Sequence, residues 1–304
     1  MVQEYEIIVG HALTKSFILP DVCGLRCLGG DFEKLSHALA KKRPVLIFDH
    51  RGIGQSTYST PAEGDSITIE SMARDVVDLI SGIGLTKVAI CGYSMGGSIT
   101  QQMITLPYHS TNPTPLPFVV THVILAATMP CPLKKGSSKY SIKIRPPPKD
   151  RSLTLKERRE EIREFVANMF DPEWMNEERN SEAFEWHLNR MVTGRPFPTV
   201  MKQMRATGRF EFRPQLKQLS PSLPVMVIHG DYDRIVSPEY GEQILQLIPW
   251  ARRVQVGDQP GQIPSNGFGH TWWEYFDLQV WIDVVEIFLS GGSEDPDRGS
   301  KAKL

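Results

Sequence analysis

Four short apolar runs, rich in β-branched residues, constrain the fold of this 304-residue chain more than any other feature. They occupy residues 43–50, 86–92, 120–127 and 223–230. None of them alternates between apolar and polar positions, which is typical of strands that are covered on both faces. Segments with helical periodicity lie between the runs. The chain therefore predicts an α/β fold, with a mainly parallel central sheet and helices on both faces.

One region interrupts this alternation of strands and helices. Residues 131–220 contain almost no strand signal, and a helix is expected to begin at Thr154, with Glu157 completing a capping box. The apolar residues expected on one face of this helix are Leu155, Ile162, Phe165, Val166 and Met169. We therefore expect a core made of residues 1–130 and 221–291, with a helical insertion at residues 131–220.

The position of this insertion favours a lid over an active site, because insertions at strand ends commonly carry function. A second structural domain is the alternative interpretation. The insertion is also rich in large apolar side chains, which either line an acyl-sized pocket or form its own core. These side chains are Phe165, Met169, Phe170, Trp174, Phe184, Trp186, Met191, Met201 and Met204.

The second apolar run leads without a gap into the sequence AICGYSMGGS, which places Ser94 between a strand and a helix. Gly92 lies two residues before this serine and Gly96 two residues after it. A sharp strand-to-helix turn holds such a serine in a strained conformation and leaves no room for side chains at those two positions. The dipole of the following helix also favours negative charge at this point. Ser94 is therefore a candidate nucleophile.

A serine hydroxyl needs a base to become a good nucleophile, and a base in turn needs an orienting group. Asp231 and Asp233 follow the fourth apolar run directly, and His270 lies in a glycine-flanked loop before the closing helix. The order serine, aspartate, histidine along the chain fits the predicted sheet. These residues are the candidates for the acid and the base.

Four motifs together resemble the α/β-hydrolase superfamily of the serine-nucleophile type. They are FDHRGIGQS at residues 48–56, GYSMGG at 92–97, IHGDYDRIV at 228–236 and GFGH at 267–270. The resemblance implies that Ser94 is the nucleophile, His270 the general base and acid, and Asp233 the residue that orients His270. It also implies hydrolysis of an ester or thioester of a small-molecule acyl substrate, without a cofactor. Asp231 is expected to brace its loop.

Acyl chemistry also requires two hydrogen-bond donors for the oxyanion. The resemblance assigns one to the N–H of Met95, directly after the nucleophile. Aligning Gly29 and Gly30 with the family's usual glycines makes the N–H of Leu28 the second donor, although this loop lacks the usual His-Gly pair. This departure leaves an alternative open, namely a non-hydrolytic lyase or binding protein with an impaired oxyanion hole.

Other residues near these motifs have simpler expected roles. His229 and His50 are expected to be structural. Trp272 and Trp273 either wall an apolar substrate pocket or pack beneath the last helix. Composition excludes further classes: the net charge is −1, no block of like charge indicates nucleic-acid binding, and no apolar run is long enough to span a bilayer. No cluster of residues indicates a metal site.

The last 13 residues, 292–304, are rich in glycine, serine and charge, which predicts an exposed, disordered tail. This tail ends in Ala302, Lys303 and Leu304, a small-basic-leucine tripeptide that resembles the peroxisomal targeting signal read by the import receptor. A peroxisomal location is therefore expected, with the cytoplasm as the alternative. The resemblance extends to fungal peroxisomal hydrolases of toxin (secondary-metabolite) biosynthesis.

A fluorescent protein fused to the amino terminus tests this targeting prediction, because it leaves Leu304 accessible to the receptor. We expect punctate fluorescence that overlaps a peroxisomal marker. Removing Ala302, Lys303 and Leu304 is expected to make the fluorescence cytosolic. Diffuse fluorescence from the intact fusion would return the expected location to the cytoplasm.

Overall fold

The computed structural model describes residues 5–8, 19–57, 67–134, 136–137, 139–140, 146–148 and 150–291. Its sheet has seven strands in the order β1-β3-β2-β4-β5-β6-β7, and only β1 is antiparallel to its neighbour. The strands are β1 (Tyr5–Ile8), β2 (Leu19–Val22), β3 (Val45–Phe48), β4 (Lys87–Tyr93), β5 (Val119–Ala126), β6 (Val225–Ile228) and β7 (Arg252–Arg253). The four apolar runs form β3, β4, β5 and β6, which confirms the mainly parallel sheet.

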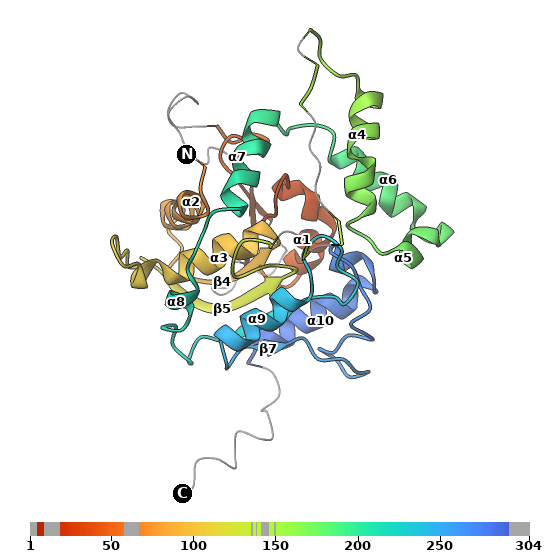
Figure 1. Cartoon of the computed structure of the whole chain (residues 1–304). Coiled ribbons are helices and arrows are strands. Elements are labelled where there is room, and N and C mark those ends of the chain that lie inside the picture. Colours follow the sequence, from red (N-terminus) through yellow and green to blue (C-terminus); the bar gives the residue numbers. More distant parts are fainter. Residues whose placement is uncertain are drawn as a thin grey trace, which may run out of the picture.

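Helices cover both faces of this sheet, as expected (Figure 1). The α-helices of the core are α1 (Glu33–Ala40), α2 (Ile69–Gly82), α3 (Met95–Thr105), α9 (Glu239–Leu247) and α10 (Leu278–Leu289). Short 3₁₀ helices occur at η1 (Gly29–Phe32), η2 (Leu106–Tyr108), η3 (Glu178–Asn180) and η4 (Trp272–Glu274). α1 and α10 pack on one face, and α2 and α3 pack on the other.

β3 and β6 are apolar and buried at every position, because each face of the sheet meets a different layer of helices. Ala89 and Cys91 of β4 pack in the cluster that contains α1 and α10. Val88 and Ile90, which alternate with them, pack in the cluster that contains α2 and α3. Successive side chains of a strand point to opposite faces, so both sets are buried. The absence of a polar period in the sequence is thus a direct consequence of the two layers.

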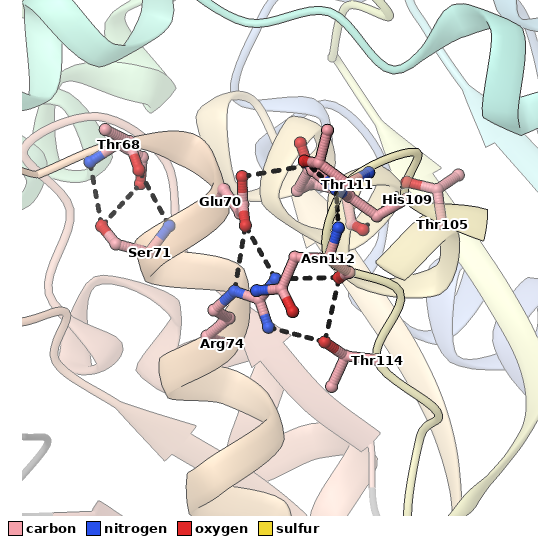
Figure 2. Close-up of polar contacts among 10 residues, drawn as sticks. Thr68, Glu70, Ser71, Arg74, Thr105, His109, Thr111, Asn112 and Thr114 are labelled. Carbon is pink, nitrogen blue, oxygen red and sulfur yellow. Dashed lines mark hydrogen bonds and ion pairs between the residues drawn. The ribbon is translucent and has the colours of Figure 1, made fainter. Parts of the chain in front are cut away.

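The start of α2 is fixed by a capping box and a polar network on the surface (Figure 2). Thr68 Oγ1 accepts a hydrogen bond from the Ser71 N–H at 2.9 Å, and Ser71 Oγ accepts one from the Thr68 N–H at 2.9 Å. One turn on, the Arg74 guanidinium pairs with Glu70 at 2.7 Å and donates to Thr114 Oγ1 at 2.8 Å. These contacts tie α2 to the loop that leads from α3 to β5.

Five α-helices lie between β5 and β6 in the described part of the chain, in the region of the expected insertion. They are α4 (Leu155–Ala167), α5 (Pro172–Asn176), α6 (Ser181–Arg190), α7 (Phe197–Thr207) and α8 (Arg213–Leu216). α4, α5 and α6 gather into a group that projects from the sheet (Figure 1). The capping box of Thr154 and Glu157 is confirmed. Leu155, however, is 61% exposed, because it begins α4 ahead of the stretch around Ile162 that packs on α6.

Two ion-pair clusters join these helices to the core. Glu274 of η4 accepts from His187 Nε2 of α6 at 2.8 Å and from Lys34 Nζ of α1 at 3.2 Å. Burial raises the pKa of Glu274, but the hydrogen bond and charge of His187 and the charge of Lys34 outweigh it, so the net shift is downward. The Arg195 guanidinium likewise pairs with Asp31 at 2.5 Å, and both side chains are buried. Polar contacts therefore anchor this group of helices at two places.

The expected tail, including Ala302, Lys303 and Leu304, lies outside the described residues. The boundaries of the insertion remain an expectation. Among the residues that the structure describes, no helix has both the length and the apolar character needed to cross a membrane.

Replacing Thr68 by alanine removes the side-chain acceptor at the start of α2. We expect the free energy of unfolding to fall by about 1 kcal/mol, the usual effect of losing a threonine cap. Thr111→Ala, in the neighbouring group of polar contacts (Figure 2), is a matched control, because its exposed hydroxyl makes only a 3.4 Å contact with His109. Urea denaturation of both variants measures the difference. Equal stability of the two variants would contradict the capping role of Thr68.

Candidate active site

Ser94 lies in the sharp turn from β4 to α3, with φ 54° and ψ −124°. This left-handed backbone conformation is rare outside glycine and projects the side chain away from both elements. The neighbouring glycines make the turn possible. A Cβ atom at Gly96 would lie 1.8 Å from the Val22 carbonyl oxygen, and one at Gly92 would lie 2.4 Å from Thr100 Oγ1. Any larger residue would push the turn away from β2.

The structure brings the three residues predicted as nucleophile, base and acid together at the carboxyl edge of the sheet. His270 Nε2 lies 3.1 Å from Ser94 Oγ, and His270 Nδ1 lies 2.8 Å from Asp233 Oδ2. An ionised carboxylate can only accept, so Nδ1 carries the proton and Nε2 is free to accept from the serine hydroxyl. All three side chains are buried. Asp231, by contrast, is exposed, and its carboxylate lies 3.9 Å from the Arg253 guanidinium.

The Asp233 carboxylate is fully satisfied. Oδ1 accepts from the N–H groups of Ile235 and Val236, each at 2.9 Å. Oδ2 accepts from His270 and lies 3.3 Å from His229 Nε2. Burial raises the pKa of Asp233. The charge of His270 and the hydrogen bonds from both histidines lower this pKa by more than burial raises it, so the net shift is downward. Asp233 therefore stays ionised throughout the pH range in which an imidazole titrates.

His229 contributes more to the site than the sequence indicates. It was expected to be structural, and its Nε2 does lie 3.0 Å from the Val236 carbonyl oxygen. The same nitrogen, however, lies 3.3 Å from Asp233 Oδ2, the oxygen that also accepts from His270 Nδ1. The available sequence signal was its place at the end of a strand, four residues before Asp233. Nothing in the sequence reveals that the acid loop folds back over it.

The loop after β2 lies beside Ser94, but not in the register expected from the sequence. The Leu28 N–H donates to Asp31 Oδ2 at 2.9 Å, so it is engaged away from the nucleophile. Instead, a Cβ atom at Gly24 would lie 3.0 Å from Ser94 Cβ, and Leu25 lines the cavity at Ser94 together with Met95. Within the described part of the chain, no acceptor takes the Leu25 N–H. Leu25 thus replaces Leu28 as the candidate second donor.

This difference has a physical origin in β2. Pro20 and Gly24 interrupt the apolar pattern of residues 16–25, so these residues predict a poor strand. The sequence alone therefore does not show where this strand ends. In the structure Pro20 is aligned only with Leu46 of β3, while β4 pairs with Asp21 and Val22. The missing N–H of the proline therefore leaves the pairing with β4 intact. The strand ends at Val22, and the loop that follows passes directly over the nucleophile.

A cavity of about 40 Å³ adjoins Ser94, which is room for roughly one water molecule. This cavity is lined by three of the nine large apolar side chains that the sequence places in the insertion, namely Phe165, Met169 and Met191. Phe170 and Trp174 instead stack on each other at 4.0 Å between ring centroids. Some of these side chains therefore line a cavity at Ser94 that is smaller than the expected acyl-sized pocket, and others pack on each other.

The two tryptophans after His270 take no part in lining this cavity. Trp272 packs against Trp281 of α10, with ring centroids 4.5 Å apart. Trp273 lies edge-on to Tyr93, with ring centroids 5.2 Å apart, on the core side of the nucleophile turn. Of the two interpretations of this pair, packing in the core is therefore the one that the structure supports, for Trp272 against the last helix and for Trp273 against Tyr93.

Comparison with known proteins agrees with this architecture. Residues 24–256 match the family described as serine aminopeptidase, S33. RutD of Caulobacter segnis, provisionally described as a carbamate hydrolase, is 36% identical over 61 residues, which span 20% of this chain and 22% of RutD. YisY of Bacillus subtilis, an AB hydrolase superfamily protein, is 23% identical over 227 residues, or 72% of this chain and 78% of YisY. The chain thus spans less than a third of the RutD relatives it matches.

Solved structures share the whole fold at low sequence identity. The enol-lactonase from Burkholderia xenovorans superposes with a TM-score of 0.66 at 20% identity, covering 95% of this chain and 98% of the other. The esterase EaEST from Exiguobacterium antarcticum gives 0.65 at 18% identity, covering 94% of each chain. With its matched family region and its shared fold, the chain belongs to the serine aminopeptidase S33 family of the α/β-hydrolase superfamily.

Proposed function

We propose that this protein is a serine hydrolase that cleaves an ester or thioester bond of a small-molecule acyl substrate. The observation that carries the proposal is the unbroken chain of hydrogen bonds from Asp233 through His270 to Ser94, held at a strained turn between strand and helix. A serine packed for structural reasons alone requires neither the left-handed backbone nor an oriented imidazole.

The proposed reaction proceeds through an acyl-enzyme. Ser94 Oγ attacks the acyl carbon while its proton passes to His270 Nε2, and the C–O or C–S bond breaks as the leaving group takes that proton. Water then attacks the acyl-enzyme, gives a proton to the same nitrogen, and the acid leaves as Ser94 recovers its proton. The Asp233 carboxylate stabilises the imidazolium formed in both steps, because it remains charged beside it.

Two backbone donors are proposed to stabilise the oxyanion in each step. The Met95 N–H lies at the start of α3, where the first N–H groups of a helix lack partners within the helix. The Leu25 N–H comes from the loop after β2, next to Ser94. This pair argues against the alternative of a non-hydrolytic relative, which depended on an impaired oxyanion hole. The relatives named as an esterase and an enol-lactonase also favour acyl substrates.

Replacing Ser94 or His270 by alanine tests the chemistry. We expect kcat/KM on the best 4-nitrophenyl ester to fall by about 10⁴-fold or more, because the two residues act as one unit. Asp233→Asn should cost somewhat less. Circular dichroism and thermal melting serve as the control for folding. A folded Ser94→Ala variant with turnover close to the parent protein would contradict the mechanism.

Replacing Gly24 by alanine tests the corrected position of the oxyanion loop. The new Cβ would lie 3.0 Å from Ser94 Cβ and 3.3 Å from the Tyr93 ring, so the loop must shift away from the nucleophile. We expect kcat to fall by roughly ten- to a hundredfold, since one oxyanion donor contributes on this scale or above. Gly82→Ala is the matched control, because no atom lies within 4 Å of a Cβ there. Equal activity of both variants would count against Leu25 as a donor.

A further inference from the structure

A second and much larger cavity, of about 810 Å³, adjoins the cavity at Ser94. Three segments contribute neighbouring residues to both cavities. Leu25 and Cys27 line the cavity at Ser94, whereas Arg26 between them lines the large one. In the same way Phe165 and Met191 face the nucleophile, while Ile162 and Val192 face the large cavity. The two cavities therefore adjoin each other, and these three segments form the wall at their boundary.

Arg26 is held rigidly at this wall. Its φ of 62° places it in the left-handed region, which is unfavourable for a residue with a side chain. Its N–H donates to Gln203 Oε1 at 3.2 Å, and its carbonyl oxygen accepts from Arg195 Nε at 2.6 Å. Arg195 is fixed in turn by its ion pair with Asp31. A strained backbone that is held from both sides indicates that the direction of this side chain matters.

The Arg26 guanidinium is a charge without a matching partner among the described residues. Its Nε is buried and makes no hydrogen bond, and the buried Nε2 of Gln203 is unpartnered as well. Asp31, the nearest candidate anion on the same loop, is already paired with Arg195. Burial and the charge of Arg195 lower the pKa of Arg26 to about 10, so it remains charged at neutral pH.

Four arginines and two acidic residues line the large cavity, but only two of these arginines lack an ion pair in the described structure, so the unpaired charges of the lining balance. Arg26, Arg151, Arg158 and Arg195 line it, together with Asp150 and Glu161. Arg151 is paired with Glu157 and Arg195 with Asp31, which leaves Arg26 and Arg158 without an ion pair in the described structure. Glu161 lies close enough to raise the pKa of Arg26, but it forms no ion pair with it in the described structure.

We propose that this cavity is a substrate subsite in which Arg26 binds an anionic group, a carboxylate or a phosphate, remote from the bond cleaved at Ser94. This inference rests on the proposed hydrolase function and names its substrate class. A planar guanidinium binds two oxygens of such a group side by side, and this pairing compensates a buried charge. The apolar side chains around Arg26, such as Phe197 and Val200, would then contact the chain that joins the anion to the acyl carbon.

Two esters with the same leaving group test the proposal. 4-Nitrophenyl hydrogen adipate carries a terminal carboxylate, and 4-nitrophenyl heptanoate replaces that carboxylate by an alkyl end. The readout is the ratio of kcat/KM for the two esters, after subtraction of the rate without enzyme. In Arg26→Met we expect this ratio to fall by roughly ten- to a hundredfold, the usual scale for a lost charge-assisted contact. Arg26→Lys should give an intermediate ratio, because it retains the charge but not the planar fork.

Arg163→Met is the matched control, since Arg163 lies on α4 with Arg158 but pairs outside the cavity with Glu185. Its ratio should equal that of the parent protein. An equal loss on both esters in Arg26→Met would mean that Arg26 acts only through the Leu25 loop, and would overturn the proposal. If Arg26→Met does not fold, an unchanged ratio in Arg26→Lys, together with Arg158→Met, would also overturn it.

A binding measurement separates this proposal from the hydrolase function. In the Ser94→Ala background, adipate and inorganic phosphate are each added while the thermal midpoint is recorded. We expect at least one of them to raise the midpoint, and Arg26→Met to abolish the shift. A shift with adipate alone identifies a carboxylate subsite, and a shift with phosphate alone a phosphate subsite. No shift with either anion overturns the proposal, whereas failure to hydrolyse any ester would count against the hydrolase function alone.

Discussion

The close approach of α3 to β2 is the contact on which the rest of the site depends. Gly96 packs directly against the carbonyl oxygens of Val22 and Cys23, with no room for a side chain. This contact sets the left-handed turn at Ser94 and also brings the loop after β2 over the nucleophile. The proposed nucleophile and the proposed oxyanion donors therefore have one common origin, and Tyr93, next to this nucleophile, packs with Trp273 and Phe32 in an aromatic layer.

The helices between β5 and β6 are coupled to this contact through Arg195. Its guanidinium joins the Arg26 carbonyl oxygen to Asp31, and Asp31 in turn holds the Leu28 N–H. A single buried side chain thus fixes both ends of the turn that follows the proposed oxyanion donor. Movement of these helices and the geometry of the loop are therefore coupled, as expected if the helices act as a lid over the small cavity at Ser94. Opening the helices would widen the cavity and change the donor loop together.

Much of the fold and of the site could be predicted from the sequence, because local patterns determine them. Each strand from β3 to β6 is a continuous apolar run, and Ser94, Asp233 and His270 each follow a recognisable strand end or glycine pair. The position of the loop after β2 could not be predicted, because a proline is unusual inside a strand and Pro20 lies within β2. The structure tolerates it because β2 pairs only with β3 at Pro20 and with β4 only from Asp21 on. The partners of His229 and Arg26 depend on how distant segments fold back over them, and no local pattern records that. The exposure of Leu155 has the same cause.

Reaction of the full chain with a fluorophosphonate, followed by peptide mass spectrometry, tests the central claim most directly. Such a probe forms a covalent bond only with a serine that is activated by a base and faces an oxyanion hole. The account predicts one adduct, on the peptide that contains Ser94, with loss of labelling in Ser94→Ala and strong slowing in His270→Ala. A folded protein that remains unlabelled at Ser94, or that is labelled at another serine, would contradict it.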